Sequence, residues 1–547
     1  MTKCVCLLSL ASLLFSFALF AQEEHQHTER LEKIGKVSFP ITCDHSVQKE
    51  FERGLALLHS FWYEEAQKSF KDVIDQDPHC AIAYWGQALS IYRPLWNRPT
   101  ASDLQNGRKL IQVAKAIDGN SQRERDYIDA LAVFYGDDNR DYQKRSADYC
   151  HVMQILFTRY PEDRESAVFY ALSLLGSQPD NDSNLENPKR AIAILAELFK
   201  EAPDHPGVAH YIIHAADNPH LAALGLPAAR RYAQIAPASP HALHMPSHIF
   251  ARLGLWQEDI QSNLASIAAT NQSSGMHVGA EHQIHATDFL EYAYLQIGES
   301  SKAKAIVDQL AAIHEDDVDP GLDGYLDRMR AHLPAMYALE MHHWMEALAL
   351  QPPAGAEPGS QAITYWARAV AAGHLRNVAA ARDAVLQYDA MLDTVRNSSR
   401  PYRADYMSTN GVEAHAWLAF AEGKNDEALR LLSSLADKQD AEGKGEVELP
   451  AREMLGDMLL EMSHSREALA EYQKSLKTDP NRFNGLFGAA RSAELLHDLQ
   501  TAAAYYAQLL KNCETRAQRP ELSHAKGLLT RNQPESWPPS PDFEFND

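Results

Sequence analysis

Histidine is concentrated in one stretch of this chain. Of its 25 histidines, ten lie between His205 and His285, where an even spread over 547 residues would place about four. Three pairs in this stretch are spaced i,i+4, which puts both side chains on one face of a helix. They are His210/His214, His244/His248 and Glu281/His285. An imidazole or carboxylate pair at this spacing can chelate one metal ion.

The three pairs recur at nearly constant intervals. The second pair follows the first by 34 residues, and the third follows the second by 37. Stacked units of about that length would place the pairs side by side. Imidazole and carboxylate without thiolate suit Zn, Cu, Ni or Fe, so we expect the pairs to converge on one divalent transition metal ion.

A second interpretation of the same histidines remains open, in which they serve as hydrogen-bonding groups along a groove. Two local features also disturb the regular spacing. Pro246 either kinks a helix at His244 or begins a helix with His244 in the preceding turn. The Asn218-Pro219-His220 loop follows the first pair and shifts its register.

The elements that must carry these side chains are helices. Apolar residues recur mostly every three to four positions, and the period-two alternation of strands is nearly absent. In a unit that begins at Val47, Gly54, Ala66, Phe70 and Pro78 fall at positions 8, 20, 24 and 32. Two antiparallel helices that cross closely need Gly or Ala at the contact, and Pro ends the second helix.

The same spacing returns near the C-terminus, in a further set of residues: Leu455, Gly456, Ala468, Tyr472, Pro480, and then Ala502 and Tyr506. On these motifs the chain resembles the secreted tetratricopeptide-repeat (TPR) proteins of bacteria, over roughly residues 47–515. The resemblance implies an all-α fold, a right-handed superhelical solenoid of TPR-type helix hairpins.

The resemblance also implies a concave groove lined by the first helix of each unit. His244, His248 and His285 would face it. The candidate ligand-binding residues along the same wall are Trp85, Tyr92, Arg93, Asp288, Tyr292 and His332. Such a wall suits a protein or peptide partner, or a small ligand, and the alternative for Trp85, Tyr92 and Arg93 is a role in packing.

The charge of the chain and an N-terminal targeting signal indicate its kind of partner and its compartment. The chain has 51 Lys+Arg against 74 Asp+Glu, a net charge of −23, and no block of consecutive basic residues, which argues against a nucleic-acid partner. Lys3, an apolar run of 16 residues from Val5 to Phe20 and then Ala21 are typical of a secretory signal peptide. We expect a periplasmic or secreted protein with no membrane span after cleavage.

Cleavage would leave Cys43, Cys80, Cys150 and Cys513, without a Cys-x-x-Cys motif. This spacing leaves room for one disulfide but indicates neither a disulfide framework nor a thiolate zinc knuckle. The expected organisation is a signal peptide at 1–21, a linker at 22–46, a TPR solenoid at 47–515 with histidine-rich units at about 205–290, and a polar, Pro-rich tail at 516–547.

No zincin helix, nucleophile elbow, Walker loop or dinucleotide-binding motif occurs in the sequence. The leading interpretation is an exported TPR scaffold that binds a protein, peptide or small ligand in its groove and carries a His/Glu metal site. The alternative is a metal-dependent enzyme in which the three pairs hold a catalytic metal, with Asp288 or Tyr292 as base or donor. The residues leave the catalytic question and the oligomeric state open.

Overall fold

The computed structural model describes residues 33–95, 98–136, 139–179, 184–273, 280–314, 323–398, 400–513, 517 and 519–531. Within these ranges the regular secondary structure is helical throughout, and none of it is strand. The predicted all-α class is therefore confirmed. The signal peptide expected at 1–21 and His277 lie outside the described residues.

The chain folds into two compact units. The first half of the chain contains η1 (His45–Val47), α2 (Gln48–His59), α3 (Tyr63–Gln76), α4 (Ala81–Tyr92), α5 (Ala101–Ala116), α6 (Gln122–Tyr135), α7 (Tyr142–Arg159), α8 (Arg164–Gly176), α9 (Glu186–Glu201), α10 (Pro206–Ala216), α11 (Ala222–Ile235), α12 (Pro240–His244), α13 (Pro246–Arg252) and α14 (Trp256–Ser273). Unit 1 takes the chain up to Ile249 and resumes at Ser262 within α14, whereas Phe250–Gln261 belongs to unit 2.

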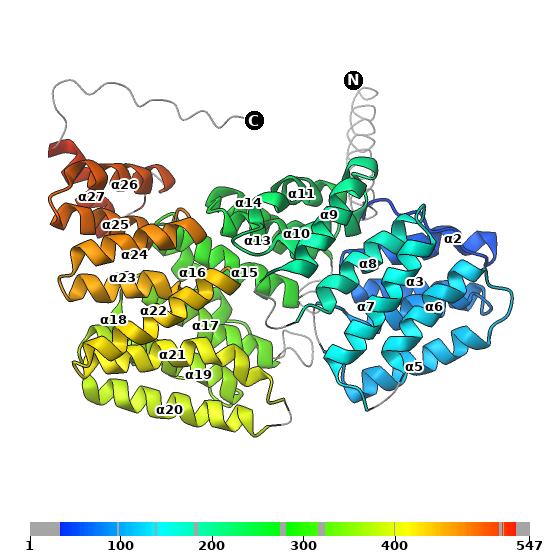
Figure 1. Cartoon of the computed structure of the whole chain (residues 1–547), viewed down its shortest axis with the longest axis horizontal. Coiled ribbons are helices and arrows are strands. Elements are labelled where there is room, and N and C mark those ends of the chain that lie inside the picture. Colours follow the sequence, from blue (N-terminus) through cyan, green and yellow to red (C-terminus); the bar gives the residue numbers. More distant parts are fainter. Residues whose placement is uncertain are drawn as a thin grey trace, which may run out of the picture. The chain divides into compact units, whose positions relative to one another are not determined.

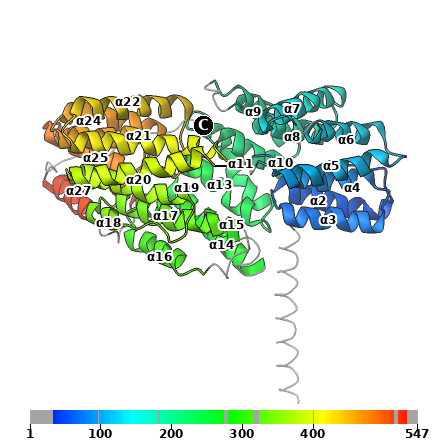
Figure 2. The same cartoon turned by 90° about the horizontal axis from the view of Figure 1, so that it is seen from below.

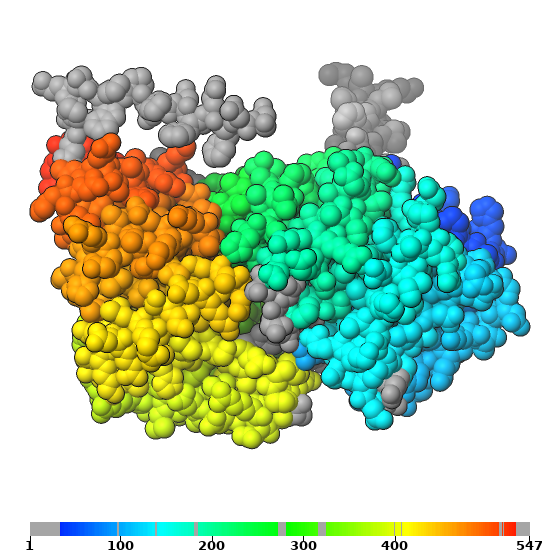
Figure 3. All heavy atoms as spheres, in the orientation of Figure 1, coloured from blue at the N-terminus to red at the C-terminus, as the bar shows by residue number. Residues whose placement is uncertain are grey.

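The remaining helices belong to unit 2. They are α15 (Ala280–Gln296), α16 (Ser300–Ala311), α17 (Asp323–Glu340), α18 (Trp344–Ala349), α19 (Pro358–His374), α20 (Val378–Arg396), α21 (Arg403–Ala421), α22 (Asn425–Glu442), α23 (Ala451–Glu461), α24 (Ser465–Thr478), α25 (Phe483–Leu495), α26 (Leu499–Asn512) and α27 (Pro520–Arg531). Figure 1 shows α20 to α24 as stacked rows, Figure 2 shows the rows of α20, α21 and α22 from below, and in Figure 3 the same part of the chain forms successive bands from yellow to orange.

Each helix packs on the next one along the chain, from α2 to α12 in unit 1 and from α19 to α27 in unit 2. The contacts use the small and aromatic residues that the repeat pattern singled out. A Cβ on Gly54 or Gly86 would lie 3.0 or 2.6 Å from the Phe70 ring, so α2 and α4 both close on that ring. Gly456 and Gly488 enclose Tyr472 in the same way. The TPR-type hairpins predicted from these positions are confirmed.

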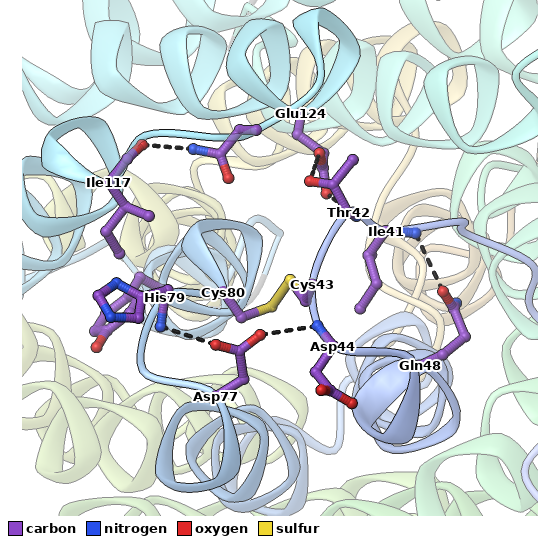
Figure 4. The surroundings of a disulfide bond; sticks show 12 residues. Ile41, Thr42, Cys43, Asp44, Gln48, Asp77, His79, Cys80, Ile117 and Glu124 are labelled. Atoms are coloured by element: carbon purple, nitrogen blue, oxygen red, sulfur yellow. Dashed lines mark hydrogen bonds between the residues drawn. A yellow bond between two sulfur atoms is a disulfide. The ribbon is translucent and has the colours of Figure 1, made fainter.

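The expected linker does not hold for residues 33–46. Phe39 is completely buried, with its ring centroid 5.1 Å from that of Tyr127 and 5.4 Å from that of Phe51. A disulfide joins Cys43 to Cys80, the residue directly before α4. The sequence had left one disulfide possible without assigning the pair. Figure 4 shows this extended segment running beside α2 and the α3–α4 loop.

Polar contacts reinforce the disulfide. The backbone N–H of Asp44 donates to the Asp77 carboxylate at 2.9 Å, and that of Thr42 donates to the Glu124 carboxylate at 2.8 Å, so the segment is tied to the residue that follows α3 and to α6 (Figure 4). Sequence periodicity misses this segment because it is extended and buries one aromatic ring through contacts far along the chain.

The expected tail does not hold for residues 520–531, which form α27. Leu522, Ala525 and Leu528 on this helix are buried against α25 and α26. The three positions are spaced i, i+3 and i+6, so they lie on one face, and that short apolar face was hidden by the Pro-rich composition around it. Among the helices that the structure describes, none combines the length and apolar character needed to cross a bilayer.

The close approach at Tyr472 gives a test of the hairpin packing. A Cβ on Gly488 would lie 2.3 Å from the Tyr472 ring, which is completely buried. We expect Gly488→Ala to lower the free energy of unfolding by about 1–3 kcal/mol, because the ring has no room to move. Gly359→Ala is the control, since nothing lies within 4 Å of its Cβ position in the first turn of α19. Equal denaturant midpoints for the two variants would contradict the packing described.

Candidate metal centre

Three helices of unit 1 carry five histidines in one row. His210 and His214 lie on α10, His241 and His244 on α12, and His248 on α13. From His214 through His210, His241 and His244 to His248, successive ring centroids are 4.7, 4.9, 6.4 and 5.0 Å apart. We call these five residues the histidine row.

Local sequence explains where these helices begin. Pro206 opens α10 and Pro240 opens α12, each at a first-turn position where a missing N–H costs nothing. The residue before each proline caps the helix: His205 Nδ1 accepts from the N–H of Val208, and Ser239 accepts from that of Ala242.

Pro246 begins α13 directly after Met245. The helix is therefore interrupted at Met245, with His244 as the last residue of α12 and Pro246 as the first residue of α13. The i,i+4 pair nevertheless stays together, because the Nε2 atoms of His244 and His248 are 3.0 Å apart.

Three ring nitrogens converge at one end of the row. The Nε2 of His210 lies 3.1 Å from that of His241 and 3.1 Å from that of His214. We call these residues the three-histidine cluster. Three imidazole nitrogens bound to one tetrahedral ion, with bonds of about 2.0–2.1 Å, would stand about 3.3 Å apart. The observed spacing is close to that of a metal site.

The protonation of His210 follows from its other nitrogen. Nδ1 lies 2.6 Å from the backbone carbonyl oxygen of His59, which can only accept a hydrogen bond, so Nδ1 carries a proton. Burial lowers the pKa of His210 to about 3, which keeps the ring neutral. Its Nε2 therefore presents a lone pair to the other two rings. A backbone carbonyl that orients an imidazole in this way is a common second partner of metal-binding histidines.

Aromatic rings enclose the cluster. The Phe61 ring centroid lies 4.4 Å from that of His210 and 5.3 Å from that of His214, and Tyr232 is stacked on His210 at 5.1 Å. Phe61 has φ +54°, a left-handed conformation that costs a bulky residue about 1–2 kcal/mol. This turn follows α2 and places the ring over the histidines. His210 and His241 are buried, whereas His214 is partly exposed and borders solvent.

The structure thus brings together the first predicted pair and adds His241, which the sequence interpretation did not include. Little in the sequence indicated His241, because no histidine or carboxylate stands four residues before or after it. Glu281 and His285, the third predicted pair, lie on α15 in unit 2. Convergence of all three pairs on one ion remains a prediction.

The groove residues predicted in unit 1 are placed differently from expectation. Trp85 and Tyr92 are each only 1% exposed, with their rings packed on Phe169 and Phe134. They belong to the core, and the assignment of these two side chains to a ligand groove is wrong. Arg93 stays half-buried, paired with Glu64 at 2.8 Å.

In unit 2, Tyr292 is also buried, and its hydroxyl accepts from Arg482. It is therefore part of an internal polar network and does not line a groove. Asp288 Oδ1 lies 3.3 Å from His332 Nε2, and both residues are largely buried. Their role in ligand binding stays a prediction.

A second histidine arrangement in unit 1 was also missed. Glu165 on α8 accepts from His59 Nε2 at 2.9 Å and from His205 Nε2 at 2.7 Å, and all three residues are buried. Burial by itself raises the pKa of the Glu165 carboxyl, but His205 and His59 outweigh it, so the pKa lies well below its usual range. The Nδ1 atoms are also engaged, with Tyr211 at His59 and the start of α10 at His205.

This network joins the ends of α2, α8 and α10, and it holds His59, whose carbonyl fixes His210. Its residues come from three distant segments, so sequence spacing gave no signal for it. All four ring nitrogens have protein partners, which favours a structural role for this group.

No protein-family model and no curated protein sequence matches the chain. Among solved structures, a human IFIT1 dimer with m7Gppp-AAAA matches at 12% identity over 79% of this chain and 90% of that chain, with a TM-score of 0.35. A Naa15/Naa10 complex bound to HypK-THB matches at 13% identity over 89% and 74%, with a TM-score of 0.25. The P58(IPK) TPR domain matches at 13% identity over 83% and 99%, with a TM-score of 0.20.

At these identities and scores the comparisons assign no ligand or activity to this chain. The helices, their sequential packing and the Gly-aromatic contacts define an all-α protein built from TPR-type hairpins.

The Glu165 network gives a stability test. Glu165→Ala would leave two buried ring N–H groups without their acceptor, so we expect the free energy of unfolding to fall by about 3–5 kcal/mol. Glu197→Ala is the control, because it removes an exposed carboxylate paired with Lys200 and should change nothing measurable. Urea denaturation measures the free energy of unfolding of both variants. A Glu165→Ala protein as stable as the control would show that the network does not hold these helices together.

Proposed function

We propose that this protein is an exported, TPR-type helical scaffold that binds a divalent transition metal ion at the three-histidine cluster of His210, His214 and His241. The observation that supports the proposal is the convergence of three Nε2 atoms, with both separations from His210 at 3.1 Å. The same three residues offer ligand atoms that all lie within 4.8 Å of one another. Zn, Cu, Ni or Fe suits an all-imidazole set.

The neutral state of His210 supports a metal ion more than a chain of hydrogen bonds. Its single Nε2 lone pair can accept one hydrogen bond well, yet two ring nitrogens stand at 3.1 Å from it. One cation among the three nitrogens satisfies all of them at once. The carbonyl of His59 and the rings of Phe61 and Tyr232 provide the orientation and the water-poor shell that such a site needs.

Three protein ligands leave one position of a tetrahedral ion for water or a ligand atom. His214 is the partly exposed member of the cluster, and we expect that position on its solvent side. This is the feature that favours the second candidate function, a metal-dependent enzyme in which the ion activates water or a bound ligand. Partner binding in a groove lacks comparable support, since Trp85 and Tyr92 are core residues.

Export is supported by two independent observations. The first residues resemble a secretory signal peptide, as in the secreted bacterial TPR proteins. The disulfide between Cys43 and Cys80 fits an oxidising compartment such as the periplasm, because cytosolic reductants keep thiols reduced.

The metal proposal is tested with untagged protein. We expect the wild type to retain a transition metal after purification and His241→Ala to contain about one equivalent less per chain. Loss of a direct ligand should weaken metal binding by more than the roughly 10–100-fold that is typical of outer-shell changes. His151→Ala is the control, since His151 is exposed on α7. Elemental analysis gives the answer: the same metal content in both variants would refute metal binding at this cluster.

Export is tested by expressing the chain with its own N-terminus in a bacterium and determining the intact mass of the product. We expect a mature N-terminus at Gln22, after Ala21, in the extracytoplasmic fraction. Leu14→Arg should interrupt the apolar run and leave an unprocessed chain in the cytoplasm. An unprocessed wild-type chain that stays cytoplasmic speaks against export.

A further inference from the structure

The other end of the histidine row holds a second arrangement that the three-histidine cluster does not use. His244 ends α12 and His248 lies one turn later on α13, and both are at most 9% exposed. Their Nε2 atoms face each other at 3.0 Å. Each ring is held from its opposite side by an oxygen atom of the same unit.

These oxygen atoms determine where the ring protons are. His244 Nδ1 lies 2.6 Å from Asn263 Oδ1 on α14, a distance that suits an N–H donor and an oxygen acceptor. His248 Nδ1 lies 2.9 Å from Asp217 Oδ2, in the loop after α10, and a carboxylate there accepts from an N–H. Each Nδ1 therefore carries a proton.

With both Nδ1 atoms protonated, two neutral rings would present their Nε2 lone pairs to each other at 3.0 Å. Two lone pairs at hydrogen-bond distance repel unless a cation lies between or beside them. The cation is either an extra proton, which makes one ring an imidazolium, or a metal ion that both nitrogens bind.

The surroundings favour the metal ion. A carboxylate behind one ligating imidazole and an amide oxygen behind the other fix both rings with the lone pair forward, which is the common outer-shell arrangement of metal-binding histidines. Ser247, also buried, donates to the Asn263 oxygen and helps to hold that amide in place. These contacts orient the nitrogens without using them.

We infer that His244 and His248 form a second site for a divalent transition metal ion, with Asp217 and Asn263 as positioning residues. The site supplies two imidazole nitrogens, and other donor atoms would complete the coordination of the ion. This inference extends the proposed function, because the second ion would be a neighbour of the first. The rings of His241 and His244, one from each site, have centroids 6.4 Å apart and share α12.

The experiment measures stoichiometry and affinity in the full chain. Untagged, metal-stripped protein is titrated with Zn²⁺ or Co²⁺ by calorimetry, and the Co²⁺ absorption spectrum is recorded at each step. We expect two equivalents for the wild type and one for His248→Ala. His241→Ala should keep the equivalent bound at His244 and His248, which makes the two sites separable.

Asp217→Asn provides a second variant with little effect on folding, because Asn keeps an acceptor oxygen. We expect it to weaken only the second equivalent, by about 10–100-fold, and to leave the first unchanged. His151→Ala is again the control with two equivalents. Circular dichroism confirms that each variant is folded.

The results distinguish the second site from the first. One equivalent in the wild type that persists in His248→Ala overturns the second site and leaves the proposed function intact. One equivalent that is lost in His248→Ala and kept in His241→Ala supports the second site and overturns the first. Two equivalents that neither substitution changes, or no bound metal at all, overturn both.

Discussion

The hydrogen bond from His210 Nδ1 to the backbone carbonyl of His59 is the interaction on which the candidate centre depends. It places the proton of the buried His210 ring on Nδ1 and leaves Nε2 with a lone pair that faces the rings of His214 and His241. The carbonyl is itself positioned, because His59 is held by Glu165 and α2 packs on α10. The carbonyl oxygen of His59, at the end of α2, therefore determines which ring nitrogen of His210 carries the proton, although the two residues are 151 positions apart in the chain.

The helical hairpins could be predicted because their signal is local. A glycine such as Gly54 or Gly456 is required wherever two helices close on one aromatic ring, and the ring recurs at a fixed distance along the same chain segment. The segment around Phe39 and the helix containing Leu522 escaped prediction for the opposite reason. Their burial depends on contacts with distant residues, and their composition resembles that of a linker or a tail.

The candidate site was predictable only in part. The i,i+4 pairs His210/His214 and His244/His248 follow from helix geometry alone, and each pair is together in the structure. His241 joins the first pair because α12 lies beside α10, but it has no i,i+4 partner that would have marked it in the sequence. Trp85 was assigned to the wrong face for a related reason. Every face of α4 is largely apolar, so its neighbours, and not its periodicity, decide which side chains are buried.

The metal centre is tested most directly by an anomalous-scattering map from crystals of the untagged, metal-loaded protein, collected at the absorption edge of the bound metal. We expect a peak at about 2 Å from the Nε2 atoms of His210, His214 and His241, with His210 Nδ1 still bonded to the carbonyl of His59. Metal-saturated crystals without a peak there, in which the three nitrogens are joined only by hydrogen bonds or have moved apart, would contradict it.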